Sequence, residues 1–274
     1  MSAPARSPLR PLLPPPEADP ERPARELAEA EALQRHLRPC ARPQHPELDV
    51  AAYTAPASEI NGDYYDFLLH DDGSLTAALG DATGHGLRAG MMVIATKTLF
   101  HTLADEAGLV EVLDRSTRVL KRMRLCRLYM SLLLARYRAG VLRLAAAGMP
   151  PVLVWRAATG EVEAVRLRGM PLGAVDAFPY REVAVELRPG DTAVLMSDGF
   201  PELLSARCGR LGYQQAVTHV AEAGGGSAAA VLDGLVDAAR GWAQGRPLDD
   251  DVTFVVLRRK PTETAPDAPP RPAR

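Results

Sequence analysis

NGDYYDFLLHDDGSLTAALGDATGHG, residues 61–86, is the stretch that decides the fold of this chain. It contains two strand-like runs, Tyr64–His70 and Ser74–Leu79, separated by the tripeptide Asp-Asp-Gly. Such a tripeptide predicts a three-residue hairpin loop in which Gly73 takes the left-handed conformation. The stretch therefore predicts an antiparallel β-hairpin.

The register of this hairpin brings two aspartates together. In each facing pair the two residue numbers add up to 144, so Asp63 faces Asp81. Directly opposed residues have Cβ atoms roughly 4.5–5.5 Å apart on one face of a sheet. Two carboxylates at that distance repel each other unless a cation lies between them or one is protonated. The open end of the hairpin is therefore a candidate cation site.

Two more acidic motifs lie at the ends of strand-like runs later in the chain. Asp198 is the centre of Ser-Asp-Gly at residues 197–199, and the run Asp249-Asp250-Asp251 precedes Val252-Thr253. Carboxylates gathered at one edge of a sheet form an oxygen-only site for hard divalent cations such as Mg²⁺ or Mn²⁺. We hypothesise that the four acidic motifs meet in one site.

Six motifs together resemble the SpoIIE/RsbU-type branch of the metal-dependent protein serine/threonine phosphatases, the PPM family with the protein phosphatase 2C fold. The resemblance runs from about Leu48 to Arg258, and the motifs occur in the order of that branch. They are Asn-Gly-Asp-Tyr-Tyr-Asp-Phe (61–67), Gly-Asp-Ala-Thr-Gly-His-Gly (80–86), Ala-Gly-Met-Pro-Pro (147–151), Gly-Met-Pro-Leu-Gly (169–173), Ser-Asp-Gly (197–199) and Asp-Asp-Val-Thr (250–253).

The chain departs from this branch at two positions. Asn61 stands where the branch usually has Gly, and Met149 stands where it usually has His. Asn tolerates left-handed backbone better than most residues, so the turn before Asp63 is expected to survive. Both departures concern turn geometry and substrate fit more than metal binding.

The resemblance implies an α+β fold, a protein phosphatase 2C-like α-β-β-α sandwich. Two antiparallel sheets would pack face to face, flanked by helix pairs, with the metals at one end. Helical patterns in two pairs, separated by strand-like runs without strict alternation, favour the same architecture. The expected helices are Leu87–Asp105, Leu109–Arg124, Tyr213–Glu222 and Ser227–Gln244. In the first of them, the expected buried stripe comprises Met91, Ile94, Ala95, Thr98, Leu99 and Leu103.

The resemblance also assigns ligands for two Mn²⁺ or Mg²⁺ ions. Asp63 and Asp81 would hold the bridging, catalytic position, assisted by the Ala82 carbonyl group. Asp198 and Asp250 would bind the metal on the second side. Asp251 stays an alternative to Asp250, although the family's Asp-x-hydrophobic-Thr spacing favours Asp250. His85, between two glycines, is a candidate for substrate binding, and a solvated loop histidine is the alternative.

The activity implied by the resemblance is direct hydrolysis of phosphoserine or phosphothreonine by a metal-bridging water, without a phosphoenzyme. The implied substrate is a STAS-domain anti-sigma-factor antagonist in a partner-switching pathway. A catalytically weak or inactive scaffold that binds partner-switching proteins is the alternative, and the four retained acidic motifs argue against it. Nucleotide binding at residues 80–86 is excluded because no Gly-Lys-Ser/Thr follows and the loop joins no βαβ unit.

Composition narrows the partners and the compartment. Net charge is −2 and the isoelectric point is near 6.3, so no nucleic-acid partner is indicated. No apolar stretch approaches the roughly 18 residues of a membrane span, so no membrane partner is indicated either. The three cysteines, Cys40, Cys126 and Cys208, are odd in number and fit a reducing cytoplasm.

Proline content predicts the domain limits. Sixteen of the 24 prolines fall in residues 1–46 and 261–274, a composition typical of disorder. We expect a disordered tail over 1–23, a linker helix and connector over 24–47, the phosphatase domain over 48–259, and a second disordered tail over 260–274.

A short amphipathic helix is predicted at residues 24–38. Leu27, Ala30, Leu33 and Leu37 recur at intervals of three and four residues, which gives one narrow apolar stripe. About 15 residues are marginal for an isolated helix, so the stripe should be buried against something. Our hypothesis is that the helix pairs with its copy in a homodimer or binds a separate activator protein, and so tunes metal occupancy. The alternative is a helix that merely packs on its own domain.

Overall fold

The computed structural model describes residues 19, 21–39, 41–125, 127–205 and 209–261. Most of the N-terminal tail predicted over 1–23 lies outside the described residues, as do residues 262–274 of the predicted C-terminal tail. The three cysteines lie outside them as well.

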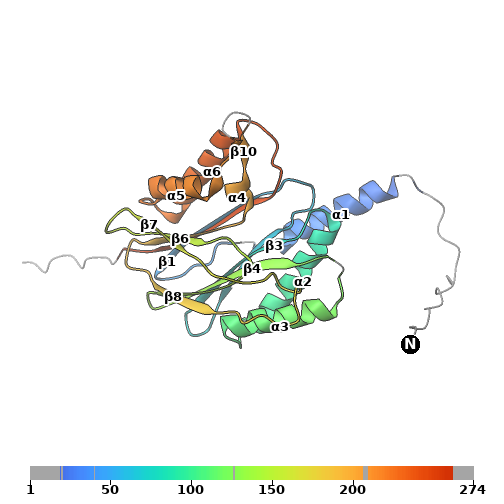
Figure 1. Ribbon diagram of the computed structural model, residues 1–274, viewed down its shortest axis with the longest axis horizontal. Coiled ribbons are helices and arrows are strands. Elements are labelled where there is room, and N and C mark those ends of the chain that lie inside the picture. Colours follow the sequence, from blue (N-terminus) through green and yellow to red (C-terminus); the bar gives the residue numbers. More distant parts are fainter. Residues whose placement is uncertain (1–18, 20, 40, 126, 206–208, 262–274) are drawn as a thin grey trace, which may run out of the picture.

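Two five-stranded sheets, antiparallel throughout, form the centre of the molecule (Figure 1). The first sheet has the order β1 (Leu48–Ala55), β12 (Val252–Arg259), β9 (Thr192–Met196), β6 (Val152–Trp155) and β7 (Val162–Val165). The second sheet has the order β2 (Asp63–Leu69), β3 (Leu75–Ala82), β4 (Met130–Arg138), β5 (Val141–Ala147) and β8 (Glu182–Glu186).

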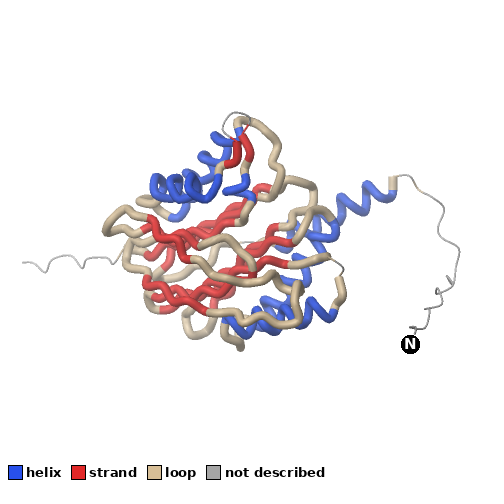
Figure 2. The backbone as a smooth tube through the Cα atoms, viewed as in Figure 1, coloured by secondary structure: helices blue, strands red, loops and turns tan. Residues whose placement is uncertain are grey.

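Two pairs of helices cover the outer faces of the sheets (Figure 2). The pair α2 (Leu87–Leu103) and α3 (Leu109–Arg122) packs on the second sheet, and the pair α5 (Gly212–Ala223) and α6 (Ala228–Ala243) packs on the first. The four layers are therefore helix, sheet, sheet and helix, as the sequence predicted.

Three hydrophobic clusters hold these layers together. One lies between the two sheets and includes Leu79, Leu133 and Val255. The other two lie under the helix pairs, around Phe100 on one side and Phe254 on the other. Because each sheet is covered on both faces, its central strands are nearly continuous apolar runs instead of alternating ones. Strand β4, with four consecutive buried residues at 132–135, shows this pattern.

The predicted buried stripe of α2 is wrong at most of its positions. Met91 and Ile94 are 57% and 50% exposed, and Leu103 is the only member of the predicted stripe that is buried. The buried residues of this helix are Ala89, Gly90, Met92, Val93, Thr96, Phe100 and Leu103. The physical reason is that α2 carries apolar residues on both faces, and the face that contacts the second sheet, which includes Met92 and Phe100, is the one that is buried.

Elements not expected from the sequence complete the fold. Strands β1 and β7 belong to the first sheet, and β1 lies at its edge beside β12. One helical turn, α4 (Gly199–Glu202), directly follows Asp198. A two-stranded ribbon, β10 (Leu204–Ser205) with β11 (Gly209–Arg210), comes next.

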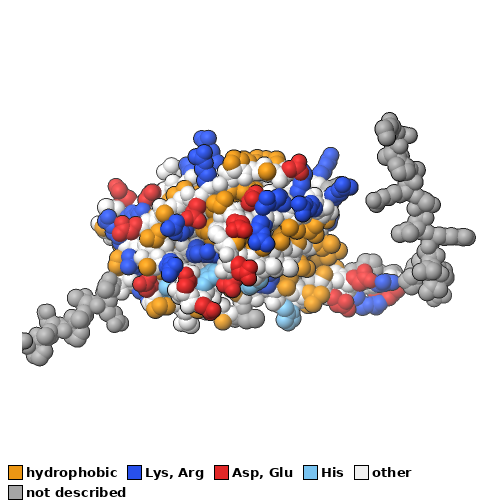
Figure 3. Space-filling model, turned by 90° about the horizontal axis from the view of Figure 1, so that it is seen from below, with side chains coloured by type: hydrophobic (Ala, Val, Ile, Leu, Met, Phe, Trp, Pro, Cys, Tyr) orange, Lys and Arg blue, Asp and Glu red, His pale blue; other side chains and the backbone are white. Residues whose placement is uncertain are grey.

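Helix α1 (Arg22–Leu37) projects from the body and contacts α2. Charged side chains cover much of its length in the space-filling view (Figure 3). Two members of its predicted apolar stripe, Leu27 and Leu33, are 40% and 68% exposed. This chain's own domain therefore leaves much of the stripe uncovered. No helix in the described ranges is both long and apolar enough to span a bilayer.

Candidate active site

The predicted hairpin is formed by β2 and β3. Asp63 is the first residue of β2, and Asp81 is the last but one residue of β3. They face each other in the β2–β3 ladder, and every other pair in this ladder has the predicted register. Gly73 in the connecting loop has φ +78°, which is the left-handed conformation expected of it. The hairpin prediction is therefore confirmed, including the pairing of the two aspartates.

The carboxylate of Asp63 is buried and incompletely satisfied. Only 7% of the residue is exposed, and its Oδ2 atom is buried without a hydrogen-bond partner. Burial raises the pKa of Asp63 well above its usual range and the charge of Asp81 raises it further, whereas the nearby hydroxyl groups of Thr253 and Ser197 lower it in part. A buried carboxylate oxygen with no donor is what a hard cation would satisfy, so the residue fits a metal ligand.

Burial and three carboxylates from two other segments raise the pKa of Asp81. Burial is the largest cause, followed by the charges of Asp198, Asp250 and Asp251, and together they raise the pKa to about 8. Repulsion on this scale requires that the acidic motifs lie near one another. The chain thus gathers segments more than 100 residues apart at one end of the sandwich, as the four-motif hypothesis proposed.

Asp250 and Asp251 have different surroundings, although the sequence left the choice between them open. Asp251 is 5% exposed, and both its oxygens accept backbone hydrogen bonds. Oδ1 accepts from the N–H of Ala57 at 2.7 Å, and Oδ2 from the N–H groups of Gly62 at 2.7 Å and Asp63 at 3.3 Å. Asp251 thus fixes the segment that carries Asp63, whereas Asp250 is exposed.

Asp198 directly precedes the single turn of α4 and lies close enough to Asp250 for their charges to interact. Burial raises the pKa of Asp198, and the charges of Asp250 and Glu202 add to the effect. The next residue, Gly199, lies directly against the backbone of the last acidic motif. A Cβ atom at this position would be 2.0 Å from the carbonyl oxygen of Asp251. The Ser-Asp-Gly motif therefore needs Gly for close packing.

These segments surround a cavity of about 320 Å³. Four predicted site residues besides Asp251 line it, namely Asp81, Ala82, His85 and Asp250. Asp63 and Asp198 do not line the cavity, but both are coupled to its carboxylates by charge. His85 is exposed, and burial raises the pKa of the neighbouring Asp250, an effect that the proximity of His85 opposes only in part. Within the described residues, no three Asp, Glu, His or Cys side chains already converge as a metal-holding group. Binding would therefore require these carboxylates to rotate toward one another.

Two further residues position the loop before Asp63. Asn61, one of the departures from the family pattern, is not left-handed, so its tolerance of that conformation is not used. Its side chain instead accepts from the N–H of Asp63 at 2.8 Å and donates to Thr54 at 2.9 Å. Its backbone is held by Gln34 of α1. The departure from the family pattern was itself the sequence signal that singled out Asn61. No sequence pattern singled out Gln34.

The other departure, Met149, points away from this chemistry. It is 8% exposed and belongs to the hydrophobic cluster between the two sheets. A thioether fills irregular space in such a core. Met149 therefore serves packing.

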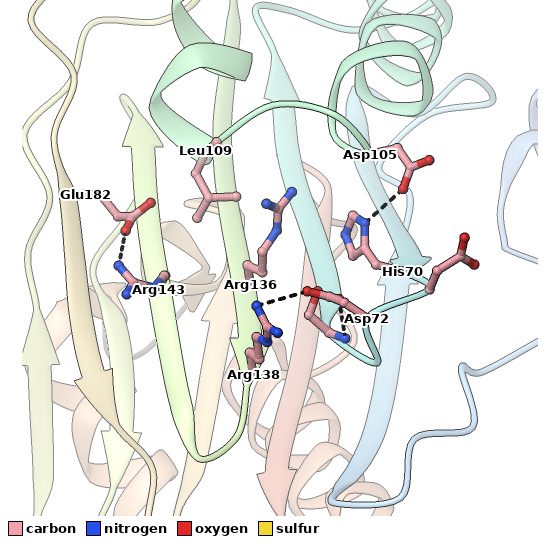
Figure 4. Close-up of a pocket in the computed structure, with 11 residues that line it drawn as sticks. His70, Asp72, Asp105, Leu109, Arg136, Arg138, Arg143 and Glu182 are labelled. Carbon is pink, nitrogen blue, oxygen red and sulfur yellow. Dashed lines mark hydrogen bonds and ion pairs between the residues drawn. The ribbon is translucent and has the colours of Figure 1, made fainter.

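A larger cavity, of about 620 Å³, lies at the other end of the hairpin (Figure 4). The length of β2 puts it roughly 20 Å from Asp63. Six of its lining side chains are joined in pairs, Arg138 with Asp72, Arg143 with Glu182 and His70 with Asp105. The acidic motifs do not reach this cavity, so the candidate active site is the smaller one.

The fold and the gathered carboxylates define the protein phosphatase 2C-like class. The chain belongs to the SpoIIE family, because the family described as Stage II sporulation protein E (SpoIIE) matches residues 71–260. It is 28% identical over 222 residues to the phosphoserine phosphatase RsbU of Bacillus subtilis (strain 168), a match that covers 80% of this chain and 65% of RsbU.

Solved structures agree with this assignment. The RsbU and RsbW domains of a Mycobacterium tuberculosis protein superpose with a TM-score of 0.67 at 26% identity, over 80% of this chain and 62% of that one. The SiaA-PP2C domain of Pseudomonas aeruginosa superposes with a TM-score of 0.75 at 19% identity, over 87% of this chain and 98% of that one. The predicted fold and family are therefore confirmed.

Proposed function

We propose that this protein is a metal-dependent phosphatase that hydrolyses phosphoserine or phosphothreonine on another protein. The observation that carries the proposal is the Asp63–Asp81 pair, two opposed carboxylates of which one has a buried oxygen without a donor. Asp198 and Asp250 add negative charge at the same end of the sandwich. This concentration of carboxylates suits hard divalent cations, and we propose two Mn²⁺ or Mg²⁺ ions.

The proposed ligands divide the work. Asp63 and Asp81 would hold the shared position with help from the Ala82 carbonyl group, and Asp198 and Asp250 would hold the second side. When bound, the two cations supply positive charge for the phosphoryl group and lower the pKa of water. Asp251 has a positioning role, because it ties the segment of Asp63 to the end of the chain's last loop.

The reaction needs no nucleophilic side chain. Water adds to phosphorus, the bond between phosphorus and the serine oxygen breaks, and the serine leaves as its alcohol after it gains a proton. His85, exposed at the cavity that Asp81 and Asp250 line, would contact the phosphorylated residue.

A STAS-domain anti-sigma-factor antagonist is the substrate that we propose. Support comes from the similarity to RsbU, named as a phosphoserine phosphatase, and to a chain that joins RsbU and RsbW domains. Dephosphorylation would release the antagonist to bind an anti-sigma kinase in a partner-switching pathway.

Control through α1 is part of the same proposal. The exposed Leu27 and Leu33 leave a surface for a second copy or a separate activator. Gln34 on the same helix is hydrogen-bonded to the backbone just before Asp63. A partner that shifts α1 would therefore change the position of Asp63 and hence metal occupancy.

The test is hydrolysis with added Mn²⁺, measured on p-nitrophenyl phosphate and on phosphorylated STAS-domain proteins. We expect activity that EDTA removes and that Asp81→Ala and Asp198→Ala abolish while the circular dichroism spectrum is unchanged. Full activity of either variant, or of the EDTA-treated protein, would refute the proposal. Activity on the ester without activity on any STAS protein would refute only the substrate.

A further inference from the structure

A mostly apolar groove of about 400 Å³ lies between α6, β1 and the loop at residues 245–248. Tyr53, Ala239, Ala243 and Leu248 are among its apolar lining residues. Tyr53, Ala239 and Leu248 pack against the hydrophobic cluster under α5 and α6, so the groove is where that core reaches the surface. Arg240 and Arg246 line it as exposed side chains.

The groove continues into the candidate active site. Leu248 lines both the groove and the cavity that contains Asp81 and Asp250. Asp250 is two residues further along the chain, so its Cα atom is at most about 7 Å from that of Leu248. A protein segment that reaches the acidic cavity therefore passes directly beside the groove.

The chemistry of the two spaces is complementary. The cavity at Asp81 carries several acidic side chains and suits a phosphoryl group with its cations, whereas the groove is lined mainly by apolar side chains. Sites that select a ligand combine apolar surface with a few placed polar groups. Arg240 pairs with Asp237 at 3.6 Å and Arg246 with Asp249 at 3.2 Å. Such exposed pairs are weak, so an acidic side chain of a ligand competes with them readily.

We propose that this groove receives an apolar side chain of the phosphoprotein substrate, about two to four residues from the phosphorylated residue. An acidic residue beyond that side chain would meet Arg240 or Arg246. The inference rests on the proposed phosphatase function and adds a determinant of substrate choice to it. The groove thus selects among phosphoproteins, whereas the carboxylates act on any phosphate ester that reaches them.

The experiment uses phosphoserine peptides with alanine and glycine neighbours, in which one leucine is moved from four residues before to four residues after the phosphoserine. The kcat/KM of the full chain with Mn²⁺ is measured for each peptide, and p-nitrophenyl phosphate serves as the ester without a peptide. Ala239→Glu places a charge in the groove, and Ala238→Glu places the same charge on the same helix outside it. Binding of the fluorescent peptides to metal-free protein is measured by anisotropy in parallel.

We expect one leucine position to raise kcat/KM about tenfold in the wild type and in Ala238→Glu, but not in Ala239→Glu. All three proteins should hydrolyse the ester equally. No favoured position, or the same gain in both variants, would overturn the proposal. A change of oligomeric state in Ala239→Glu without a loss of peptide selection would also overturn it and assign the groove to a second copy. If no protein hydrolyses the ester, the phosphatase function fails, and the groove is decided by whether Ala239→Glu alone weakens anisotropy binding.

Discussion

Gln34 and Asn61 form two hydrogen bonds that join the projecting helix α1 to the loop before Asp63. The Nε2 atom of Gln34 donates to the carbonyl oxygen of Asn61 at 2.5 Å, and its Oε1 atom accepts from the N–H of Asn61 at 2.8 Å. The Asn61 side chain in turn accepts from the N–H of Asp63. Asn61 is therefore the one residue that links Gln34 of the helix to Asp63 of the carboxylate pair by hydrogen bonds.

Replacing Gln34 tests this connection. In Gln34→Leu the buried N–H and C=O groups of Asn61 lose their partners, at a cost of about 1–3 kcal/mol. We expect a several-fold rise in the Mn²⁺ concentration that gives half-maximal hydrolysis of p-nitrophenyl phosphate, with the fold retained. The matched control is Arg35→Gln, which removes an exposed ion pair on the same helix. Equal Mn²⁺ dependence of both variants and the wild type would show that the helix does not influence the site.

Asp250 and Asp251 should respond differently to the same substitution. Asp251→Ala removes an acceptor of three backbone N–H groups, and charge-assisted hydrogen bonds contribute about 1.5–3 kcal/mol each. We expect this variant to lose at least about 2 kcal/mol of unfolding free energy in urea. Asp250→Ala should keep its stability within about 0.5 kcal/mol and lose metal-dependent activity. The reverse pattern would assign the ligand to Asp251.

The metal-free protein should lose stability as the pH rises from about 4 to about 8. The pKa of Asp81 is raised to about 8 by burial and by the neighbouring carboxylates, so between the ordinary pKa of Asp and this value the folded state binds more protons than the unfolded state. Unfolding in EDTA at pH 5.5 and pH 8 measures the effect. Asp81→Asn should be the more stable protein at pH 8 and should show a flatter pH dependence. If the stability of Asp81→Asn depends on pH as that of the wild type does, Asp81 is not the group whose raised pKa destabilises the metal-free protein.

How far the sequence predicts this molecule depends on whether its signal is local. The Asp63–Asp81 register follows from one loop tripeptide, because hairpin geometry is set by a few adjacent residues. The face of α2 could not be read in the same way, since Met91 and Ile94 are as apolar as the residues that the helix buries. Which face of α2 is buried is decided by the sheet on which the helix packs.

The candidate site shows the same division. Its aspartates stand in recognisable motifs, and the structure brings these motifs to one end of the sandwich. The contacts that position them link distant segments, as with Gln34 and Asn61 or Asp251 and Ala57. A hydrogen bond across 27 or 194 residues leaves no periodic pattern. Such contacts had to come from the structure.

Gly199→Ala should be among the most damaging single changes at the site, although it adds only a methyl group. The new Cβ atom would lie 2.0 Å from the carbonyl oxygen of Asp251. The backbone segment that carries Asp198 and the one that carries Asp250 must therefore move apart. We expect a loss of about 3 kcal/mol or more in unfolding free energy and a loss of Mn²⁺-dependent activity. Gly241→Ala is the control, because a Cβ atom there has no neighbour within 4 Å and helix propensity favours Ala by about 1 kcal/mol. If Gly199→Ala unfolds at the same urea concentration as the wild type, the close contact between α4 and the last acidic motif does not hold Asp198 in place.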